Sequence, residues 1–211
     1  MKIFFFLLMP TLLALTIGMP QAQTDLSEGL RQYSEGQAAN DRGDYSSAMR
    51  IWRNLADKGD SYSQYAIGDM YLKGKGVKQD PSQAQYWLHR AASAGVVDAQ
   101  VSLGAMYMRG LGIPVNEKEG LRWTLAAANC DNSGAQWNMA LVYANGMGVV
   151  KDMVQSLKWT YLAAQAGRAK TPHPSANAGI KQIERSLSQR DIDQAKRLAF
   201  EWRMSPQCKL R

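Results

Sequence analysis

Few residues of this chain could act as a catalytic base. Nucleophilic catalysis by Ser or Cys needs a base within hydrogen-bond reach, and histidine is the usual one. The 211 residues contain only His89 and His173, and no Cys or carboxylate lies beside either of them in the sequence to orient the ring. No residues have the spacing of a zinc site. The sequence therefore predicts a protein without catalytic residues, bound metal or cofactor.

Pairs of glycines could suggest a phosphate-binding loop. They occur in three related segments, YLKGKGV, YMRGLGI and YANGMGV, which begin at Tyr71, Tyr107 and Tyr143, 36 residues apart. A dinucleotide-binding fingerprint follows a strand, whereas these glycines follow Ala-, Leu- and Met-rich stretches typical of helices. Glycine readily adopts the left-handed backbone conformation of helix ends and turns. We interpret the pairs as turns that join repeats.

Many other positions keep the 36-residue interval, and each period predicts two helices. Large apolar residues recur at Ile51, Trp87, Trp123 and Trp159, and we expect them in the core between helices. Side chains that can cap a helix recur at Asp44, Asp80, Asn116 and Asp152. Helix A should begin there and end near Gly59, Gly95 and Gly167. Glu119 and Gln155, three residues after two of these caps, indicate capping boxes.

Helix B should follow, from about Tyr62, Ala99 and Ala135 to the regularly spaced Tyr residues. Its first following glycine (Gly74, Gly110 or Gly146) would cap it, and the second would form the turn.

These repeats resemble the Sel-one-like repeat family, relatives of tetratricopeptide repeats, in an exported bacterial type. The resemblance is in the core segments IGDMY, LGAMY and MALVY, the glycine turns, the caps and the Trp and Ala-Ala positions, over about residues 44–167. It implies an all-α fold, an α/α solenoid of about four helix-turn-helix repeats. Two departures occur: Asp131 replaces an expected glycine, and RAKTPHPS follows Gly167 before the helix B pattern resumes at Ala176.

The two flanks of the repeats suit the ends of such an array, which need polar outer faces. Residues 1–22 have one Lys, an apolar stretch and small residues, the order of a signal peptide. Residues 23–43, with Leu26, Leu30, Tyr33 and Gln37 at helical spacing, should form an N-terminal capping helix before a repeat domain at 44–187. Residues 188–211 should form a C-terminal capping helix and basic tail, opened by Ser188 and buried along Ile192, Ala195, Leu198, Ala199 and Trp202.

One face of helix A is the predicted binding surface. If positions 48, 51, 52 and 55 are buried, then 50, 53, 54 and 57 face outward at the helical period. Stacked repeats would align these positions as cations interleaved with Tyr, residue types enriched where interfaces concentrate binding energy. A merely solvated charged face is an equally good interpretation. The predicted binding residues are Arg50, Arg53, Tyr86, His89, Arg90, Arg122, Lys158 and Tyr161.

The net charge of +7 is concentrated at the C-terminal end. Residues 23–167 contain 14 Lys/Arg and 14 Asp/Glu, whereas residues 168–211 contain ten and four. Such a field attracts anionic partners, and we expect a basic patch at Lys196, Arg197 and Arg203. Cys130 and Cys208 could pair in an oxidising compartment, because about six residues after Trp202 can span about 20 Å; two free thiols are the alternative.

The resemblance implies adaptor work in the assembly of protein complexes. We expect an exported, periplasmic or secreted, non-catalytic scaffold or regulator. Its candidate partners are a protein or peptide, an acidic one among them, and a cell-wall polymer. The export signal disfavours nucleic acid, and no apolar run after it could span a membrane. The alternative, from secreted family members associated with β-lactams, is a peptidoglycan- or β-lactam-binding protein with weak hydrolase activity.

Overall fold

The repeats fold into a row of helices. A computed structural model describes residues 19–165 and 171–204, with side chains from residue 27 onward. Within these ranges there are ten helices and no strand, so the all-α prediction is confirmed. The helices are α1 (Met19–Asp41), α2 (Tyr45–Asp57), α3 (Ser61–Lys73), α4 (Pro81–Ser93), α5 (Val97–Arg109), α6 (Glu117–Asn129), α7 (Ser133–Asn145), α8 (Met153–Ala163), α9 (Ala176–Glu184) and α10 (Gln189–Met204).

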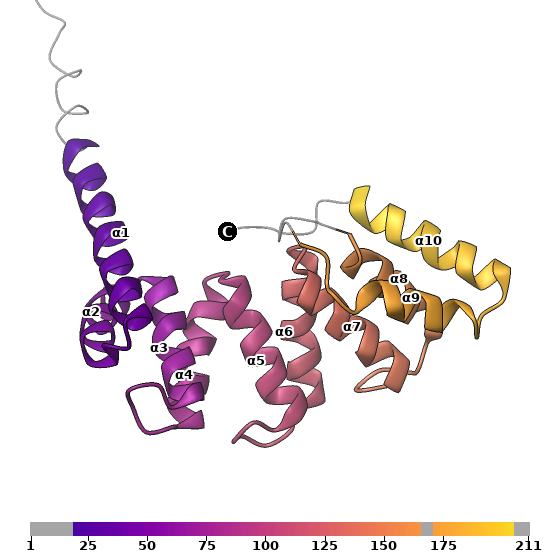
Figure 1. Cartoon of the computed structure of the whole chain (residues 1–211), viewed down its shortest axis with the longest axis horizontal. Helices are drawn as coiled ribbons and strands as arrows, with labels where there is room; N and C mark the ends of the chain where they lie inside the picture. Colours follow the sequence, from indigo (N-terminus) through magenta and orange to yellow (C-terminus); the bar gives the residue numbers. More distant parts are fainter. Residues whose placement is uncertain (1–18, 166–170, 205–211) are drawn as a thin grey trace, which may run out of the picture.

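Helices A (α2, α4, α6, α8) and helices B (α3, α5, α7, α9) alternate along an arc from α1 to α10 (Figure 1). The predicted caps begin every helix A: the side chains of Asp44, Asp80, Asn116 and Asp152 each accept a hydrogen bond from a backbone N–H of the first turn. Gly74, Gly110 and Gly146 end helices B in the left-handed conformation, as predicted.

The capping-box prediction is wrong in one respect. The backbone N–H of Asn116 donates to the carbonyl oxygen of Tyr107 at 2.9 Å, and that of Asp152 donates to Tyr143 at 3.0 Å. Because the turn brings each cap beside the preceding helix B, its N–H is already satisfied. The Glu119 carboxylate instead accepts from Arg122.

Close contact between each helix B and the next helix A depends on small residues. A β-carbon on Gly68 would lie 2.8 Å from the Leu88 side chain, and one on Gly104 would lie 2.6 Å from Thr124 Oγ1. The buried face of helix A is the predicted one, with Trp87, Trp123 and Trp159 at most 5 % exposed. These contacts hold each repeat against the next, and the buried apolar residues form successive clusters along the row of helices.

The capping ends differ partly from prediction. In the first repeat Trp52 is buried and Ile51 is only half-buried. On α1, Tyr33 packs against the core, whereas Leu30 is 64 % exposed and Gln37 is exposed. Trp52 is wide enough to contact α1 at Gly36 and Tyr33, and these contacts set which side of the helix is buried.

At the other end α10 packs along α8, with Ile192, Ala195 and Ala199 buried as predicted. Its first turn has the expected cap, in which Ser188 Oγ accepts from the N–H of Asp191. The fourth repeat resumes with α9 at Ala176, also as predicted. Residues 1–18 of the predicted signal peptide lie outside the described ranges.

Candidate binding surface

The helix A row, which we define as the eight predicted binding residues named above, lies against the buried tryptophans. Arg53 of α2 reaches the next helix A, where its guanidinium carbon lies 4.8 Å from the ring centroid of Trp87. Arg90 lies 5.2 Å from the same ring, and Tyr86 packs edge-on against it at 5.0 Å. Arg90 also donates a hydrogen bond to the Tyr86 hydroxyl at 3.3 Å. Two repeats thus meet at one indole.

The same arrangement recurs one repeat further on. The Arg122 guanidinium lies 4.1 Å from the centroid of Trp123, and the ring of His89 contacts that indole edge-on at 5.5 Å. Arg122 also pairs with Glu119 at 2.8 Å, and these hydrogen bonds hold the pKa of the Glu119 carboxyl below its ordinary value. A cation on an indole face is attracted by the ring quadrupole. The buried tryptophans therefore hold the cationic side chains of the helix A row in defined positions.

The residues of the helix A row in the fourth repeat are partly buried. Lys158 lies 4.5 Å from the Trp159 centroid but is half-buried, and burial lowers its pKa. The Tyr161 hydroxyl donates to Glu184 of α9 at 2.5 Å; burial and this carboxylate raise the Tyr161 pKa well above its ordinary value. Both residues are half-buried, as Arg90 is, and α9 and α10 pack against Tyr161.

Arg50 lies at the opposite end of the row, in a hollow between α1 and α2. Its neighbours there include Arg31 and Glu35, which pair with each other at 2.7 Å. Arg50 is exposed, so the row offers accessible side chains from the first to the third helix A.

The two histidines lie in different surroundings. The Nδ1 of His89 lies 3.5 Å from Ser93 Oγ, which is long for activation of a hydroxyl, and both side chains are exposed. His173 stacks on Trp137 at 4.9 Å, its Nδ1 accepts from the N–H of Ser175, and burial lowers its pKa. Within the described residues no group of His, Cys, Asp and Glu could hold a metal ion.

The basic patch and the cysteines lie near the C-terminal end. Lys196, Arg197 and Arg203 are all exposed on α10, and Arg197 lies 4.0 Å from Glu201. Cys130, at the end of α6, is disulfide-bonded. Its predicted partner, Cys208, lies outside the described ranges, so the pairing remains a prediction. In the part of the chain that is described, no helix has the length and apolar character needed to cross a bilayer.

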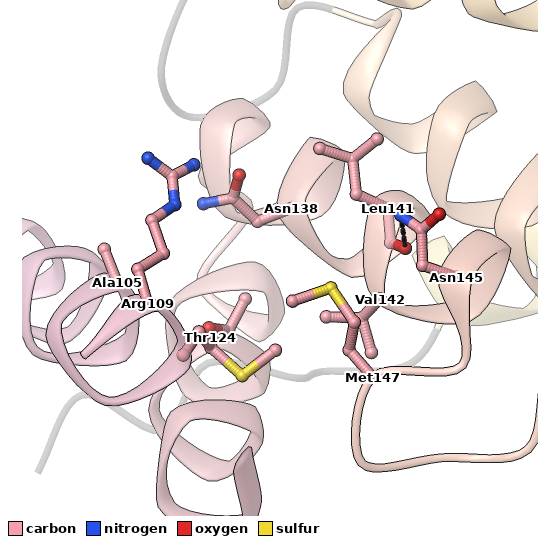
Figure 2. A pocket seen from close by; sticks show the side chains of 9 residues that line it. Ala105, Arg109, Thr124, Asn138, Leu141, Val142, Asn145 and Met147 are labelled. Atoms are coloured by element: carbon pink, nitrogen blue, oxygen red, sulfur yellow. Dashed lines mark hydrogen bonds between the residues drawn. The ribbon is translucent and has the colours of Figure 1, made fainter. Parts of the chain in front are cut away.

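A hollow that was not predicted from the sequence lies between two helices B and the helix A that separates them in the chain. This notch, which we call the α5–α7 notch, has a volume of about 150 Å³ and is lined by residues of α5, α6 and α7 and by Met147 (Figure 2). A related hollow follows one repeat later, between α7, α8 and α9. Positions 105, 108 and 124 of the first correspond to 141, 144 and 160 of the second, so the 36-residue interval could have indicated them.

Comparisons with known proteins agree with this architecture. The model of the Sel1 repeat family matches residues 61–96, 97–132 and 133–167. The chain belongs to the Sel1 repeat family. A Sel1 repeat protein from Oxalobacter formigenes has 32 % sequence identity and a TM-score of 0.55, with 62 % of this chain and 95 % of that chain covered. Sel1 repeat proteins generally mediate protein–protein interaction and are typically non-catalytic.

Two more distant structures are also similar. One is c5321, a protective antigen of uropathogenic Escherichia coli strains with an SLR fold, at 22 % identity and a TM-score of 0.47; 85 % of this chain and 46 % of that chain are covered. The other is immunity protein Pa5087 from Pseudomonas aeruginosa, at 15 % identity and a TM-score of 0.37, with 86 % and 84 % covered. No curated protein matches the chain significantly.

Proposed function

We propose that this Sel1 repeat protein is an exported, non-catalytic scaffold or regulator of the cell envelope. Its helix A row binds an acidic segment of a protein or peptide partner. The observation that carries this proposal is the stacking of cations on buried indoles across successive helices A: exposed Arg53 and half-buried Arg90 lie at Trp87, and exposed Arg122 lies at Trp123.

This stacking favours binding because the side chains are ordered before a partner arrives. A long side chain normally loses rotamer freedom when it is immobilised at an interface, and prior ordering reduces that loss. A guanidinium group stacked through its face keeps its N–H donors at the edge. Arg53 pairs there with Asp57 at 3.7 Å and Arg122 pairs with Glu119 at 2.8 Å, so a carboxylate of the partner would exchange with these exposed pairs. The row therefore suits acidic side chains spaced along an extended segment.

Export is supported by the signal-like order of residues 1–22 and by the disulfide at Cys130, since disulfides persist in oxidising compartments. The absence of catalysis is supported by the typical role of the family and by the settings of His89 and His173 described above. A partner within the envelope follows from export together with the interaction role of the family.

The test removes charge but keeps the cover over the indoles. The triple variant Arg53→Met, Arg90→Met and Arg122→Met retains long apolar side chains at the two tryptophans. We expect it to melt near the wild-type temperature and to lose at least about tenfold in affinity for an acidic partner recovered by crosslinking from the native envelope, since hydrogen bonds to charged groups contribute about 1.5–3 kcal/mol each.

The matched control loses the same charge elsewhere. Lys58, Lys75 and Lys78 are exposed in the turns after α2 and α3, and their replacement by Met should leave capture unchanged. If both triple variants weaken capture equally, net charge alone explains binding and the row has no specific role.

The basic patch on α10 has a different role from the helix A row in this proposal. Its field should speed the approach of an acidic partner without contacting it. Replacement of Lys196, Arg197 and Arg203 by Gln is expected to lower the association rate and its salt dependence while the dissociation rate is unchanged, as stopped-flow binding would measure. A faster dissociation rate would instead place the patch in the interface.

A further inference from the structure

The α5–α7 notch is lined by apolar side chains together with the polar side chains of Arg109, Thr124, Asn138 and Asn145. Val142 is buried at the cavity, where the thioether side chains of Met108 and Met147 also line it. In Figure 2 the Arg109 guanidinium and the Asn138 amide face each other at one side of the opening, from α5 and α7 respectively. A volume of about 150 Å³ is enough for a group as large as benzene, so the notch is large enough for a single aliphatic side chain.

The two polar groups have unused hydrogen-bonding capacity. Among the described residues, neither the Arg109 guanidinium nor the Asn138 amide has a hydrogen bond or ion pair, and no acidic residue lines the notch. An Arg guanidinium matches a carboxylate through two parallel N–H donors, and an Asn amide adds two more. The mouth is therefore complementary to an anionic, planar acceptor.

The preceding repeat provides an internal comparison. Thirty-six residues before Arg109 is Lys73, which pairs with Asp69 at 2.7 Å within α3. The position of Asp69 corresponds to Ala105 in α5, where no such pair can form. The chain thus neutralises the cation in one repeat and leaves it available in the next.

We propose that the α5–α7 notch binds the C-terminal residue of an extended peptide. The aliphatic side chain of that residue occupies the cavity, and its terminal carboxylate accepts hydrogen bonds from Arg109 and Asn138. A C-terminal residue suits this site because its carboxylate and its side chain leave the same α-carbon. An internal Asp or Glu places its carboxylate at the end of the side chain and leaves the cavity unfilled. This site is distinct from the helix A row.

The probe is a fluorescein-labelled hexapeptide, Gly-Ser-Gly-Ser-Ala-Leu, with a free C-terminal carboxylate, titrated with the full mature protein by fluorescence anisotropy. We expect saturable binding that weakens at least about tenfold when the C-terminus is amidated or when the final Leu is replaced by Asp. Equal binding of the acid and the amide, or no saturable binding of the acid, would overturn the proposal.

Variants locate the binding to this notch. Ala105→Asp introduces the acidic partner that Lys73 has in the preceding repeat, and it should weaken binding at least about tenfold without any change to Arg109. Arg109→Gln should do the same. Lys73→Gln, with the same charge change at the equivalent position of α3, should bind like the wild type, and circular dichroism shows that each variant is folded.

Two further results decide against the proposal. Wild-type affinity in Ala105→Asp or Arg109→Gln would place the peptide elsewhere on the protein. Competition by free N-acetyl-leucine as effective as competition by the unlabelled hexapeptide would identify the ligand as a small aliphatic acid rather than a peptide terminus.

Discussion

Trp87 shows how one residue connects the core of this protein to its surface. Its indole is 3 % exposed, yet Arg53 and Arg90 both lie on it from two adjacent helices A. Truncation of either Arg to Ala would uncover apolar surface as well as remove charge. A change in binding by such a variant could come from the exposed indole or from the lost charge. Replacement by Met removes only the charge, because the Met side chain still covers the indole.

Asp131 is a second residue whose role depends on its backbone. It replaces the glycine of the other repeats and has a φ of 62°, in the left-handed region, with its carboxylate accepting from Gln136 at 3.0 Å. Asp131→Ala keeps the steric cost of a β-carbon and loses that hydrogen bond, so we expect it to destabilise the fold by about 1–2 kcal/mol.

Asp131→Gly provides the comparison, because glycine has no β-carbon and adopts this conformation freely. It should be more stable than Asp131→Ala, as the midpoints of urea unfolding will show. If the alanine variant is the more stable of the two, the backbone at this position does not limit stability.

At the scale of the helices, local signals were predictable and distant contacts were not. The cap at Asp80 and the end of α3 at Gly74 depend on residues within one turn, and both follow from the sequence. The exposure of Leu30 depends on how α1 meets Trp52, which lies 22 residues later in the chain. The spacing of apolar residues does not determine which face of a terminal helix is buried. Such a helix packs against a neighbour on one side only, and the side chains of that neighbour decide which face is covered.

The small residues between helices B and A suggest a prediction at this scale. A β-carbon on Gly104 would lie 2.6 Å from Thr124 Oγ1 and 3.2 Å from the Thr124 backbone nitrogen, so α5 and α6 must separate. We expect Gly104→Ala to destabilise the protein by about 1–3 kcal/mol, the usual cost of overpacking, in thermal or urea unfolding.

Gly29 is the matched control, since it also lies inside a helix. Beyond the backbone of its own helix, a β-carbon there would have no atom of the described chain within 4 Å. Gly29→Ala should be neutral or stabilise by up to about 1 kcal/mol, because alanine is the better helix former. Stabilisation by Gly104→Ala as well would mean that helix propensity, not the approach of α5 to α6, dominates at both sites.

Over the whole molecule, the regular interval explains the repeats but not the places where binding is proposed. The α5–α7 notch needs three helices to meet, and its availability depends on Ala105 replacing the acid found at Asp69. In the helix A row, Tyr161 is half-buried because α9 and α10 pack against it. Both features arise where the repeats differ from one another. They therefore cannot be predicted from the positions that the repeats share.

The C-terminal end provides the last prediction, which concerns the predicted pair Cys130 and Cys208. Cys130 is disulfide-bonded at the end of α6, and a bond to the tail would close a loop of about 80 residues around the fourth repeat and α10. In the chain-entropy model such a loop stabilises the folded state by about 4.5 kcal/mol. We expect the exported, unreduced protein to be a monomer whose mass lacks both thiol hydrogens, and the double variant Cys130→Ser, Cys208→Ser to unfold at lower urea. A monomer that retains both hydrogens would contradict the pairing, and a covalent dimer would show that each cysteine bonds a second copy.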